Sequence, residues 1–589
     1  MGELLTQCLA STGYDEVSFL ALSAGDCTAL KEIYTAAFSE CKKGQTGLCL
    51  PSLRVGSVDD AIMERMADLH RPGVTLAPEA GSQRLRDVIN KGVSEAELLT
   101  HVRKLLEYGW RQVKLYFMIG LPTETDEDLE AIVALCRKAR DAAGPGGPKM
   151  QVTAAISPFV PKPFTPFQWE AQIGLAEVER RIEWLRGRMR REKGLRLKWH
   201  EPAASFLEGL LSRGDRSFAD VIEKAFHKGA LFCAWHEHFR LEPWLEAMSE
   251  CGMQPEDWLG SRDPEATLPW EHLEAGVARD FLWRERERAY AGKTTADCRF
   301  GACGQCGACD AGLRPSALAR SGEARHRLVN ARRDQSDSEV RVDEQGRLFL
   351  RPLQTRPQVA PALVQRVVQY RIWHCKDRGA EYLSQLELQA VLARAFRRAG
   401  LPVAFSQGYH PMPLISFGRA LPVGCASFAE WFLLTLHAWL GPDQLIARLN
   451  QYLPLGLRVM AADREQKKRG QAISETFLLR PRNETELPSL SALFADFASC
   501  ASFPFTRQTP KGERAVDIRR FLLNWSIVAD GSSLTGLRFG CDWSDGYISP
   551  LLLTRAIIGE DVDASLVKLA QVLPDGSQSP ALAQKLCLP

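Results

Sequence analysis

The chain has 589 residues, of which 25% are charged, and its 74 Lys and Arg residues against 72 Asp and Glu residues give a net charge of +2. At roughly 100–200 residues per domain, this length predicts about three folded units. The near-neutral balance excludes a generally polybasic or polyacidic protein, so any basic surface has to be local. The sequence lacks a signal peptide pattern, and no apolar stretch approaches the roughly 20 residues that span a bilayer. Sixteen cysteines, scattered except for one cluster, predict reduced thiols, and we expect a cytoplasmic protein with no membrane partner.

Five strand-like runs alternate with helical patterns in the first 160 residues. They are 16–23, 48–55, 73–78, 113–119 and 150–160. The helix that precedes the fourth strand begins at Ser94 with the spacing of a capping box. Strands that alternate with helices form parallel sheets through right-handed crossovers, so the sheet is either doubly wound or closed as a barrel. No Gly-rich dinucleotide fingerprint or phosphate loop follows any strand, which argues against a dehydrogenase or a P-loop NTPase.

Polar residues follow the C-terminal ends of these strands, at the rim where a barrel keeps its site. They are Asp26, Arg54, Glu79, Ser82, Glu124 and Ser157. Each of them, taken singly, is also explained as a helix cap or as part of a rim ion pair.

The segments Ala77–Arg86, Tyr116–Thr125 and Ser157–Phe167 resemble the later strands of a radical S-adenosylmethionine (SAM) enzyme core. Over residues 1–310 the chain is most similar to uncharacterised radical SAM proteins with an N-terminal cobalamin-binding-like domain. The resemblance implies an incomplete (β/α)6-type partial TIM barrel that binds SAM. It implies that the carboxylate of Glu79 meets the amino group of SAM, that Ser82 and Arg84 lie near its ribose or carboxylate, and that backbone at Gly120 and around Phe159 holds the adenine.

Radical SAM enzymes hold their catalytic [4Fe–4S] cluster on a Cys-x3-Cys-x2-Cys loop after the first barrel strand. No such triplet occurs in this chain, where Cys8, Cys27, Cys41 and Cys49 lie at other spacings. The resemblance therefore implies that strands two to six are present, while the first strand, the cluster loop and the cobalamin-type domain are absent. We expect the isolated chain to be inactive and a separately encoded N-terminal half to carry the loop. A misplaced start, a split gene and a degenerate copy all fit this pattern.

The pattern turns helical from Gly174, and the Arg-rich helix 175–193 presents either a solvated face or a basic edge for RNA. A four-cysteine motif then follows within twelve residues. It consists of Cys298, Cys303, Cys306 and Cys309. Four thiolates satisfy either an iron–sulfur cluster or tetrahedral zinc, and the tight spacing favours the cluster. If all four irons are bound by protein, this auxiliary cluster cannot bind SAM and is structural or relays electrons.

Residues 313–363 are rich in Ser, Arg, Gln, Asp and Pro, which is typical of a flexible linker. From residue 364 the order strand, helix, strands, helix predicts an α+β domain of ferredoxin-like type. Its segments 405–413 and 421–424 resemble an uncharacterised domain that is linked to radical SAM proteins. Candidate residues for binding phosphate and a stacked base are Lys376, Gln407, Tyr409, His410 and Arg519. Tyr409 and His410 are equally explained as a turn that Pro411 holds.

We therefore predict four segments and leave two function classes open. The segments are a truncated radical SAM barrel (1–200), a helical extension with the four-cysteine motif (201–312), a linker (313–363) and a radical-SAM-linked α+β domain (364–589). One class is a radical SAM protein that acts in RNA or protein modification. The other is a non-catalytic scaffold or RNA-binding protein that retains the auxiliary iron–sulfur or zinc site.

Overall fold

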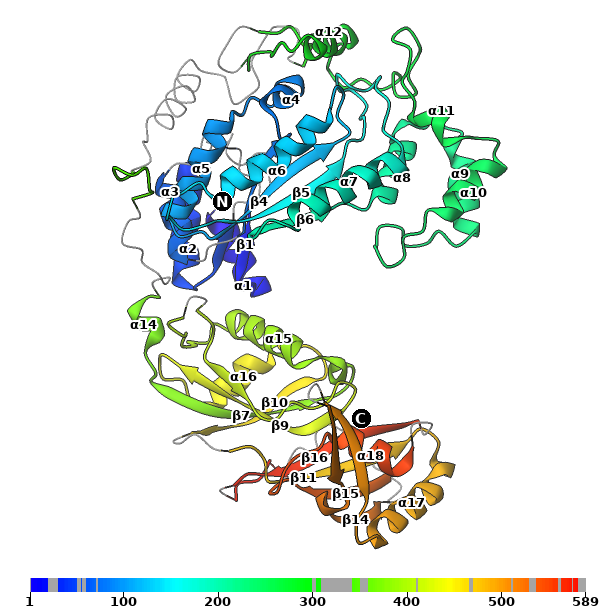
Figure 1. The fold of residues 1–589 in the computed structure, drawn as a ribbon. Helices are drawn as coiled ribbons and strands as arrows, with labels where there is room; N and C mark the ends of the chain where they lie inside the picture. The colour runs from blue at the N-terminus through cyan, green and yellow to red at the C-terminus, as the bar shows by residue number, and fades with distance from the viewer. Residues whose placement is uncertain are drawn as a thin grey trace. The chain divides into compact units, whose positions relative to one another are not determined.

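The computed structural model divides the chain into two compact units, each built from separate stretches (Figure 1). It describes residues 2–19, 30–49, 55, 60–69, 73–298, 303–308, 342–349, 359–408, 411–465, 470–509, 512–528, 536–559, 563–574 and 576–580. The N-terminal unit comprises Val17–Phe38 and Gly47–Thr355, and the C-terminal unit comprises Met1–Glu16, Ser39–Thr46 and Arg356–Pro589. The predicted segments were continuous, whereas the units are not. Most of the predicted linker lies outside the described residues.

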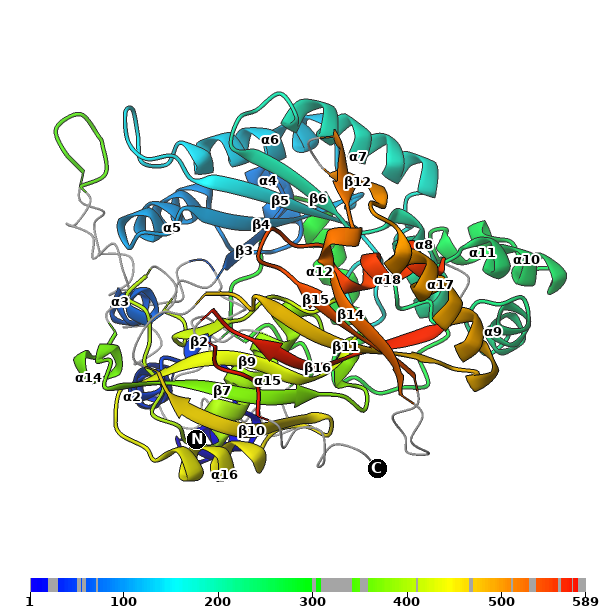
Figure 2. The ribbon, with the colours of Figure 1, turned by 90° about the horizontal axis from the view of Figure 1, so that it is seen from below.

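A four-stranded parallel sheet with the strand order β3-β4-β5-β6 forms the centre of the N-terminal unit. The strands are β3 (Val74–Glu79), β4 (Gln112–Ile119), β5 (Gln151–Pro158) and β6 (Leu195–Trp199). The helices between them are α4 (Gln83–Val88), α5 (Glu95–Glu107), α6 (Asp126–Arg140) and α7 (Leu175–Met189). Both views place α5, α6 and α7 on one side of the sheet (Figures 1 and 2). The N-terminal unit therefore contains an α/β fold with a parallel sheet.

The strands predicted around 73–78, 113–119 and 150–160 are confirmed, and so is the capping box at Ser94. The strand β6 was missed, because we expected only helices after Gly174. The runs predicted at 16–23 and 48–55 appear as β1 (Glu16–Ser18) and β2 (Gly47–Cys49), which pair as a separate small sheet. Asp26, Cys27 and Arg54 lie outside the described residues. The helices around these strands are α1 (Gly2–Thr12), α2 (Leu30–Lys43) and α3 (Asp60–Leu69).

A helical extension follows β6 in the chain. It consists of α8 (Pro202–Arg213), α9 (Phe218–His227), α10 (Glu242–Glu250), α11 (Pro255–Leu259) and α12 (Arg279–Tyr290). The fully buried guanidinium of Arg213 donates hydrogen bonds to the carbonyl oxygens of Trp258, Glu170 and Gly260, at 2.9, 2.7 and 2.6 Å. Arg213 therefore fixes the loops of the extension through backbone acceptors.

A mixed sheet with the strand order β10-β7-β9-β16-β11-β15-β14 forms the C-terminal unit, and β8 also pairs with β9. These strands are β7 (Val368–Lys376), β8 (Ile415–Phe417), β9 (Ala426–Leu436), β10 (Leu457–Arg464), β11 (Ser474–Pro481), β14 (Leu522–Val528), β15 (Gly536–Asp542) and β16 (Ala564–Val572). The ribbon β12 (Pro504–Thr509) and β13 (Gly512–Asp517) is separate. The helices are α14 (Pro361–Val364), α15 (Gln385–Arg398), α16 (Pro442–Asn450), α17 (Leu487–Ser499) and α18 (Pro550–Ile558). This region is a separate mixed α+β structure, as predicted in outline.

Two apolar cores share this sheet. Residues of α15 and α16 pack with β7, β9 and β10 in one core, and residues of α17 and α18 pack with β11, β15 and β16 in the other. Figure 2 shows β7, β9, β16 and β11 side by side, so one continuous sheet joins the two cores.

The helix α1 packs against α15 within the C-terminal unit. The Arg394 guanidinium donates to the Thr12 carbonyl oxygen at 3.2 Å and lies 4.2 Å from the centre of the Tyr14 ring. One turn further along α15, Arg397 donates to the Gly44 carbonyl oxygen at 2.8 Å. The start of the chain is therefore held by the C-terminal unit. None of the described helices has the length and apolar character needed to cross a bilayer.

Candidate functional site

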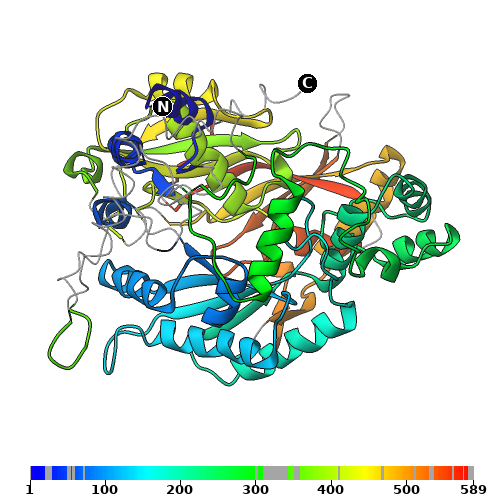
Figure 3. The ribbon, with the colours of Figure 1, turned by 90° about the horizontal axis from the view of Figure 1, so that it is seen from above.

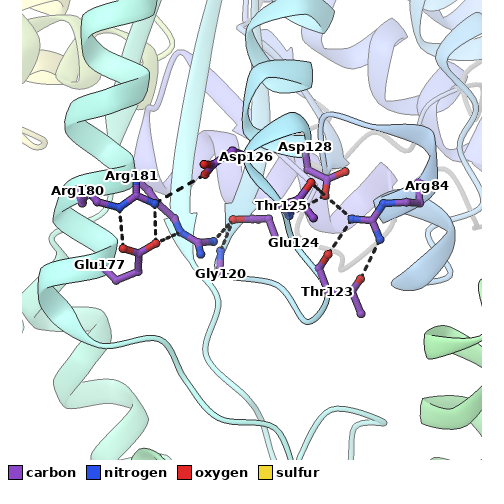
Figure 4. Close-up of polar contacts among 10 residues, drawn as sticks. All are labelled: Arg84, Gly120, Thr123, Glu124, Thr125, Asp126, Asp128, Glu177, Arg180 and Arg181. Carbon is purple, nitrogen blue, oxygen red and sulfur yellow. Dashed lines mark hydrogen bonds and ion pairs between the residues drawn. The ribbon is translucent and has the colours of Figure 1, made fainter.

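The loop after β4 is held by a buried carboxylate. Gly120, with φ of +83°, donates its N–H to Glu124 Oε1 at 2.9 Å. Glu124 also forms an ion pair with Arg181 of α7 (Figure 4). Burial raises the pKa of Glu124, although the Gly120 N–H and Arg181 favour its charged form. The Gly120 N–H already donates a hydrogen bond to Glu124, so the backbone group of Gly120 that a ligand could contact is its carbonyl.

Ser82 and Arg84, both predicted to contact SAM, meet at a single carboxylate. Ser82 caps α4 and donates its hydroxyl to Asp128 Oδ1 at 2.5 Å. Arg84 pairs with the same carboxylate (Figure 4). Arg84 also donates to the Thr123 carbonyl oxygen at 2.8 Å. Burial alone would raise the pKa of Asp128, but hydrogen bonds from Ser82, Thr125 and Arg84 hold it below its ordinary value. This network joins the starts of α4 and α6.

Gly81 makes the close approach of this loop to α6 sterically feasible. A Cβ atom at Gly81 would lie 2.2 Å from the backbone nitrogen of Ile132. Any side chain at this position would therefore push the loop after β3 away from α6.

Glu79 ends β3 with φ of +67°, a conformation that is uncommon for a residue with a side chain. Its Oε1 atom lies 2.9 Å from the Lys91 ammonium, and both side chains are about one quarter exposed (24% and 28%). A ligand amino group would therefore compete with Lys91 for this carboxylate.

A cavity of about 420 Å³ lies at the C-terminal ends of β4 and β5. Its lining is mainly apolar, with a few polar side chains, as in typical small-molecule sites. It is lined by Val88, Ile89, Asn90, Met118, Leu121, Ser157, Pro158, Phe159, Val160, Lys162, Thr165, Pro166, Phe167, Glu208, Glu285 and Ala289. Of the five residues predicted to contact SAM, only Phe159 is part of this lining, where it meets Phe167 edge to face with ring centres 6.1 Å apart.

The helix α12 supplies the far side of the cavity through Glu285 and Ala289. Figures 1 and 3 show α12, in green, above the blue and cyan strand ends. Asn90 and Thr295 exchange two hydrogen bonds of 3.1 Å, which fasten the end of α12 to the loop after α4. Asn90, Glu285 and Ala289 were not predicted, because no local pattern links positions about 200 residues apart.

Three of the four predicted metal-binding cysteines are described, and Cys309 is not. Cys298 and Cys303 are exposed, and Cys306 is partly buried. The Cys306 carbonyl oxygen accepts a hydrogen bond from the Ala278 N–H at 2.8 Å, so this loop lies at the start of α12. Among the described residues, no three His, Cys, Asp or Glu side chains gather as a metal site. The described thiols therefore do not form the centre by themselves, and the four-cysteine site stays a prediction.

Of the residues predicted to bind RNA in the C-terminal unit, the structure describes Lys376, Gln407 and Arg519. Lys376 is only 3% exposed, and its ammonium donates to the Leu383 carbonyl oxygen at 2.6 Å. Arg519 donates to the carbonyl oxygens of Ala498 and Leu522. Gln407 is exposed, and Tyr409 and His410 lie outside the described residues.

Comparisons with known proteins match both halves of the chain. Residues 7–136 match the model of the radical SAM superfamily, and residues 369–545 match an uncharacterized family conserved in bacteria, DUF2344. An uncharacterized protein of Methanocaldococcus jannaschii, MJ0966, is 29% identical over 202 residues, which are 34% of this chain and 43% of that protein. The chain thus spans less than half the length of this relative.

Two solved structures are also similar to part of the chain. They are SuiB of Streptococcus suis alone and SuiB bound to S-adenosylmethionine, each with 12% identity and a TM-score of 0.26. Each match covers 35% of this chain and 44% of the SuiB chain.

Proposed function

We propose that this chain, which joins a radical SAM superfamily domain to a DUF2344 domain, binds SAM in the cavity at the ends of β4 and β5. The observation that supports this most directly is the position of the cavity at the carboxyl ends of parallel strands, where α/β proteins bind their ligands. The cavity volume of about 420 Å³ lies in the usual range for small-molecule sites.

The residues of the cavity suit a nucleoside with a polar tail. Met118, Leu121 and Phe159 offer apolar surface for an adenine ring, and Asn90 and Ser157 offer hydrogen-bonding groups. We place the amino group of SAM beside the Glu79 carboxylate. Glu79 would then pair with this amino group in place of the Lys91 ammonium. When bound, SAM supplies an adenosyl group attached to a sulfonium centre, while the residues named here bind and orient it.

In this proposal the chain itself binds SAM, whereas cleavage of SAM needs an additional iron–sulfur cluster. The 589 residues contain no Cys-x3-Cys-x2-Cys spacing, and we propose that the catalytic three-thiolate cluster is bound by residues outside them. We propose that the parallel sheet is part of a (β/α)6-type barrel and that a further polypeptide segment supplies the cluster loop. The substrate class that we favour is RNA or protein, and we propose that the C-terminal unit is ferredoxin-like and presents this substrate.

A second candidate function is a non-catalytic scaffold or RNA-binding protein. The network of Ser82, Arg84 and Asp128 favours it, because these side chains satisfy one another. The Gly120 N–H also has its partner within the protein, because Glu124 accepts its hydrogen bond. In this reading the loops at the strand ends are structural.

Titration of the purified chain with SAM in a calorimeter distinguishes the two functions. We expect saturable binding of one SAM per chain and a loss of affinity of at least tenfold for Ser157→Trp, which fills the cavity. The matched control is Leu273→Trp, at a second cavity of about 370 Å³ beside Gly307, which should leave SAM binding unchanged. Absence of binding by the unaltered chain, or equal losses in both variants, would favour the scaffold.

A further inference from the structure

The face of the parallel sheet opposite the helices α5, α6 and α7 is polar and accessible. Parallel sheets usually bury both faces, and their strands then read as continuous apolar runs. Here β4 alternates instead: Val113, Leu115 and Phe117 are at most 2% exposed, whereas Tyr116 between them is 41% exposed. On β5, Thr153 and Ser157 of the same face are partly buried, and Ala155 between them is buried. This alternation indicates a sheet with one face for the core and one face for solvent or a ligand.

Because β4 pairs with β5 and β5 pairs with β6, the residues of this face form rows that run across the three strands. Lys114 pairs with Thr153, which pairs with Arg196, and this gives the first row. Tyr116, Ala155 and Lys198 form the second row in the same way. The third row is Met118 beside Ser157, and both of these residues line the cavity at the strand ends. The open face therefore continues into the cavity.

The first two rows form a trough with cationic sides. The small residues Thr153 and Ala155 lie on the central strand, between Lys114 on β4 and the cations Arg196 and Lys198 on β6. Arg196 and Lys198 are exposed, and Lys114 is half-buried with its ammonium 4.6 Å from the centre of the Tyr116 ring. Within the described part of the chain, no carboxylate lies at ion-pair distance from any of the three cations. Their charges are thus available to an anion.

We propose that this trough binds single-stranded nucleic acid. Neighbouring strands are about 4.8 Å apart, so the backbones that carry the cations on β4 and β6 are about 10 Å apart, and the cations flank β5 on both sides. An extended chain of phosphates satisfies them together, and the exposed ring of Tyr116 offers a surface on which a base can stack. An acidic peptide would match the charges but would offer no base to stack on the exposed part of this ring, beside Lys114.

The direction of the trough adds a functional consequence. A nucleic-acid strand that runs along β5, from the first row across the second to the third, would lead one nucleotide to Met118 and Ser157 at the cavity. This last step rests on the proposed SAM site, whereas binding in the trough does not. Nucleic-acid binding is therefore measured without SAM, so that failure of one proposal is distinguishable from failure of the other.

The test is fluorescence anisotropy of a labelled 12-nucleotide oligouridylate with the full chain, titrated at several salt concentrations. Replacing Lys114, Arg196 and Lys198 together by Gln should weaken binding at least tenfold. Each phosphate contact on a single strand contributes about 0.7 to the slope of log K against log salt, so the triple variant should lose about 2 from this slope. Tyr116→Leu should lower the affinity at every salt concentration and leave the slope unchanged.

The matched control removes the same charge from the exposed end of α7, by replacing Arg188, Arg190 and Arg191 with Gln. Circular dichroism of all variants checks that they are folded. An unchanged slope in the trough variant, or an equal change in the α7 variant, would overturn the proposal. Equal binding of inorganic polyphosphate with no dependence on Tyr116 would overturn the nucleic-acid specificity, and a labelled oligothymidylate shows whether the sugar matters.

Discussion

Lys568 of β16 lies between Glu430 of β9 and Glu475 of β11, with its ammonium 3.1 Å from Glu475 Oε1 and paired also with Glu430. Lys568 is 2% exposed and Glu475 is 4% exposed. Burial alone would lower the pKa of Lys568, but the two carboxylates raise it above its ordinary value. The Trp543 indole N–H donates to Glu475 at 2.8 Å, and the Ser427 hydroxyl donates to Glu430 at 3.0 Å. A buried charged group thus lies where the two apolar cores meet.

We predict that Lys568→Met destabilises the C-terminal unit by about 3–5 kcal/mol, because it leaves two buried carboxylates without their cation. Hydrogen exchange measured by mass spectrometry should show faster opening of β9, β11 and β16. The control is Arg482→Ala, which breaks an ion pair with Asp563 whose side chains are 78% and 67% exposed and should cost at most about 1 kcal/mol. If the triple variant K568M/E430Q/E475Q is no more stable than K568M, the burial of unpaired carboxylates is not the cause of the destabilisation.

Stability of the C-terminal unit should also fall in acid because of His374. This residue is 2% exposed, neither ring nitrogen has a hydrogen-bond partner among the described residues, and its ring centre lies 5.4 Å from that of Phe432. Burial and the nearby cations Lys568 and Lys376 lower its pKa from 6.5 to about 3. In the unfolded chain the imidazole takes up a proton below pH 6.5, so the unfolded state binds more protons between pH 6.5 and 3.

The stabilising contribution from the neutral His374 is therefore complete above pH 6.5 and is lost at up to about 1.4 kcal/mol per pH unit as the pH falls toward 3. Urea unfolding of the unaltered chain and of His374→Phe, followed by hydrogen exchange in β7, measures this difference. The variant should show the weaker pH dependence. Parallel curves for the two proteins would show that His374 does not contribute.

Gly81→Ala should destabilise the N-terminal unit by about 1–3 kcal/mol, the usual cost of forcing extra atoms into a packed site. The physical cause is the approach of 2.2 Å between the added Cβ and the Ile132 nitrogen. The urea midpoint of the full chain, with hydrogen exchange in β3 and α6, reports the effect. Gly73→Ala is the matched control, because a Cβ there meets nothing within 4 Å and should change stability by less than about 0.5 kcal/mol.

The four-cysteine segment should bind one iron–sulfur cluster or one zinc ion. Elemental analysis of anaerobically purified protein should show stoichiometric metal, and brown protein with broad absorption would identify the cluster. Cys306→Ser should remove the metal. Cys136→Ser is the control, since Cys136 is buried in α6, where burial raises the pKa of its thiol to about 12. Background metal in the unaltered protein, or equal losses in both variants, would contradict the prediction.

Short sequence patterns correctly predicted the helix start and the strand whose stability depends mainly on neighbouring residues. The capping box predicted at Ser94 is present in the structure, because a hydroxyl and a Glu three residues later satisfy free N–H groups at a helix start. The strand β4 was predicted from the strand-like run at 113–119. In contrast β6 was missed, since Leu195–Trp199 is short, carries two cations and follows an Arg-rich helix.

The candidate site was predicted only in part for a different reason. Phe159 was identified from its strand end, but the opposite wall of the cavity comes from α12, which Thr295 fastens to Asn90 across 205 residues. Ser82 and Arg84 were expected to face a ligand. In the structure both side chains donate hydrogen bonds to the Asp128 carboxylate, which is 46 and 44 residues away in the sequence. Pairings of this length depend on tertiary packing, which no local sequence pattern encodes.

The attachment of α1 to α15 bears on the order in which the protein folds during synthesis. Thr12 and Arg394 are separated by 382 residues, so α1 leaves the ribosome long before its partner helix. At about 5–20 residues per second, this interval is on the order of 20–80 s. During that time the apolar side of α1 has no native partner from α15, and the N-terminal unit has to form in its presence. A nascent chain stalled before residue 385 should therefore be a better substrate for chaperones than one stalled after residue 436.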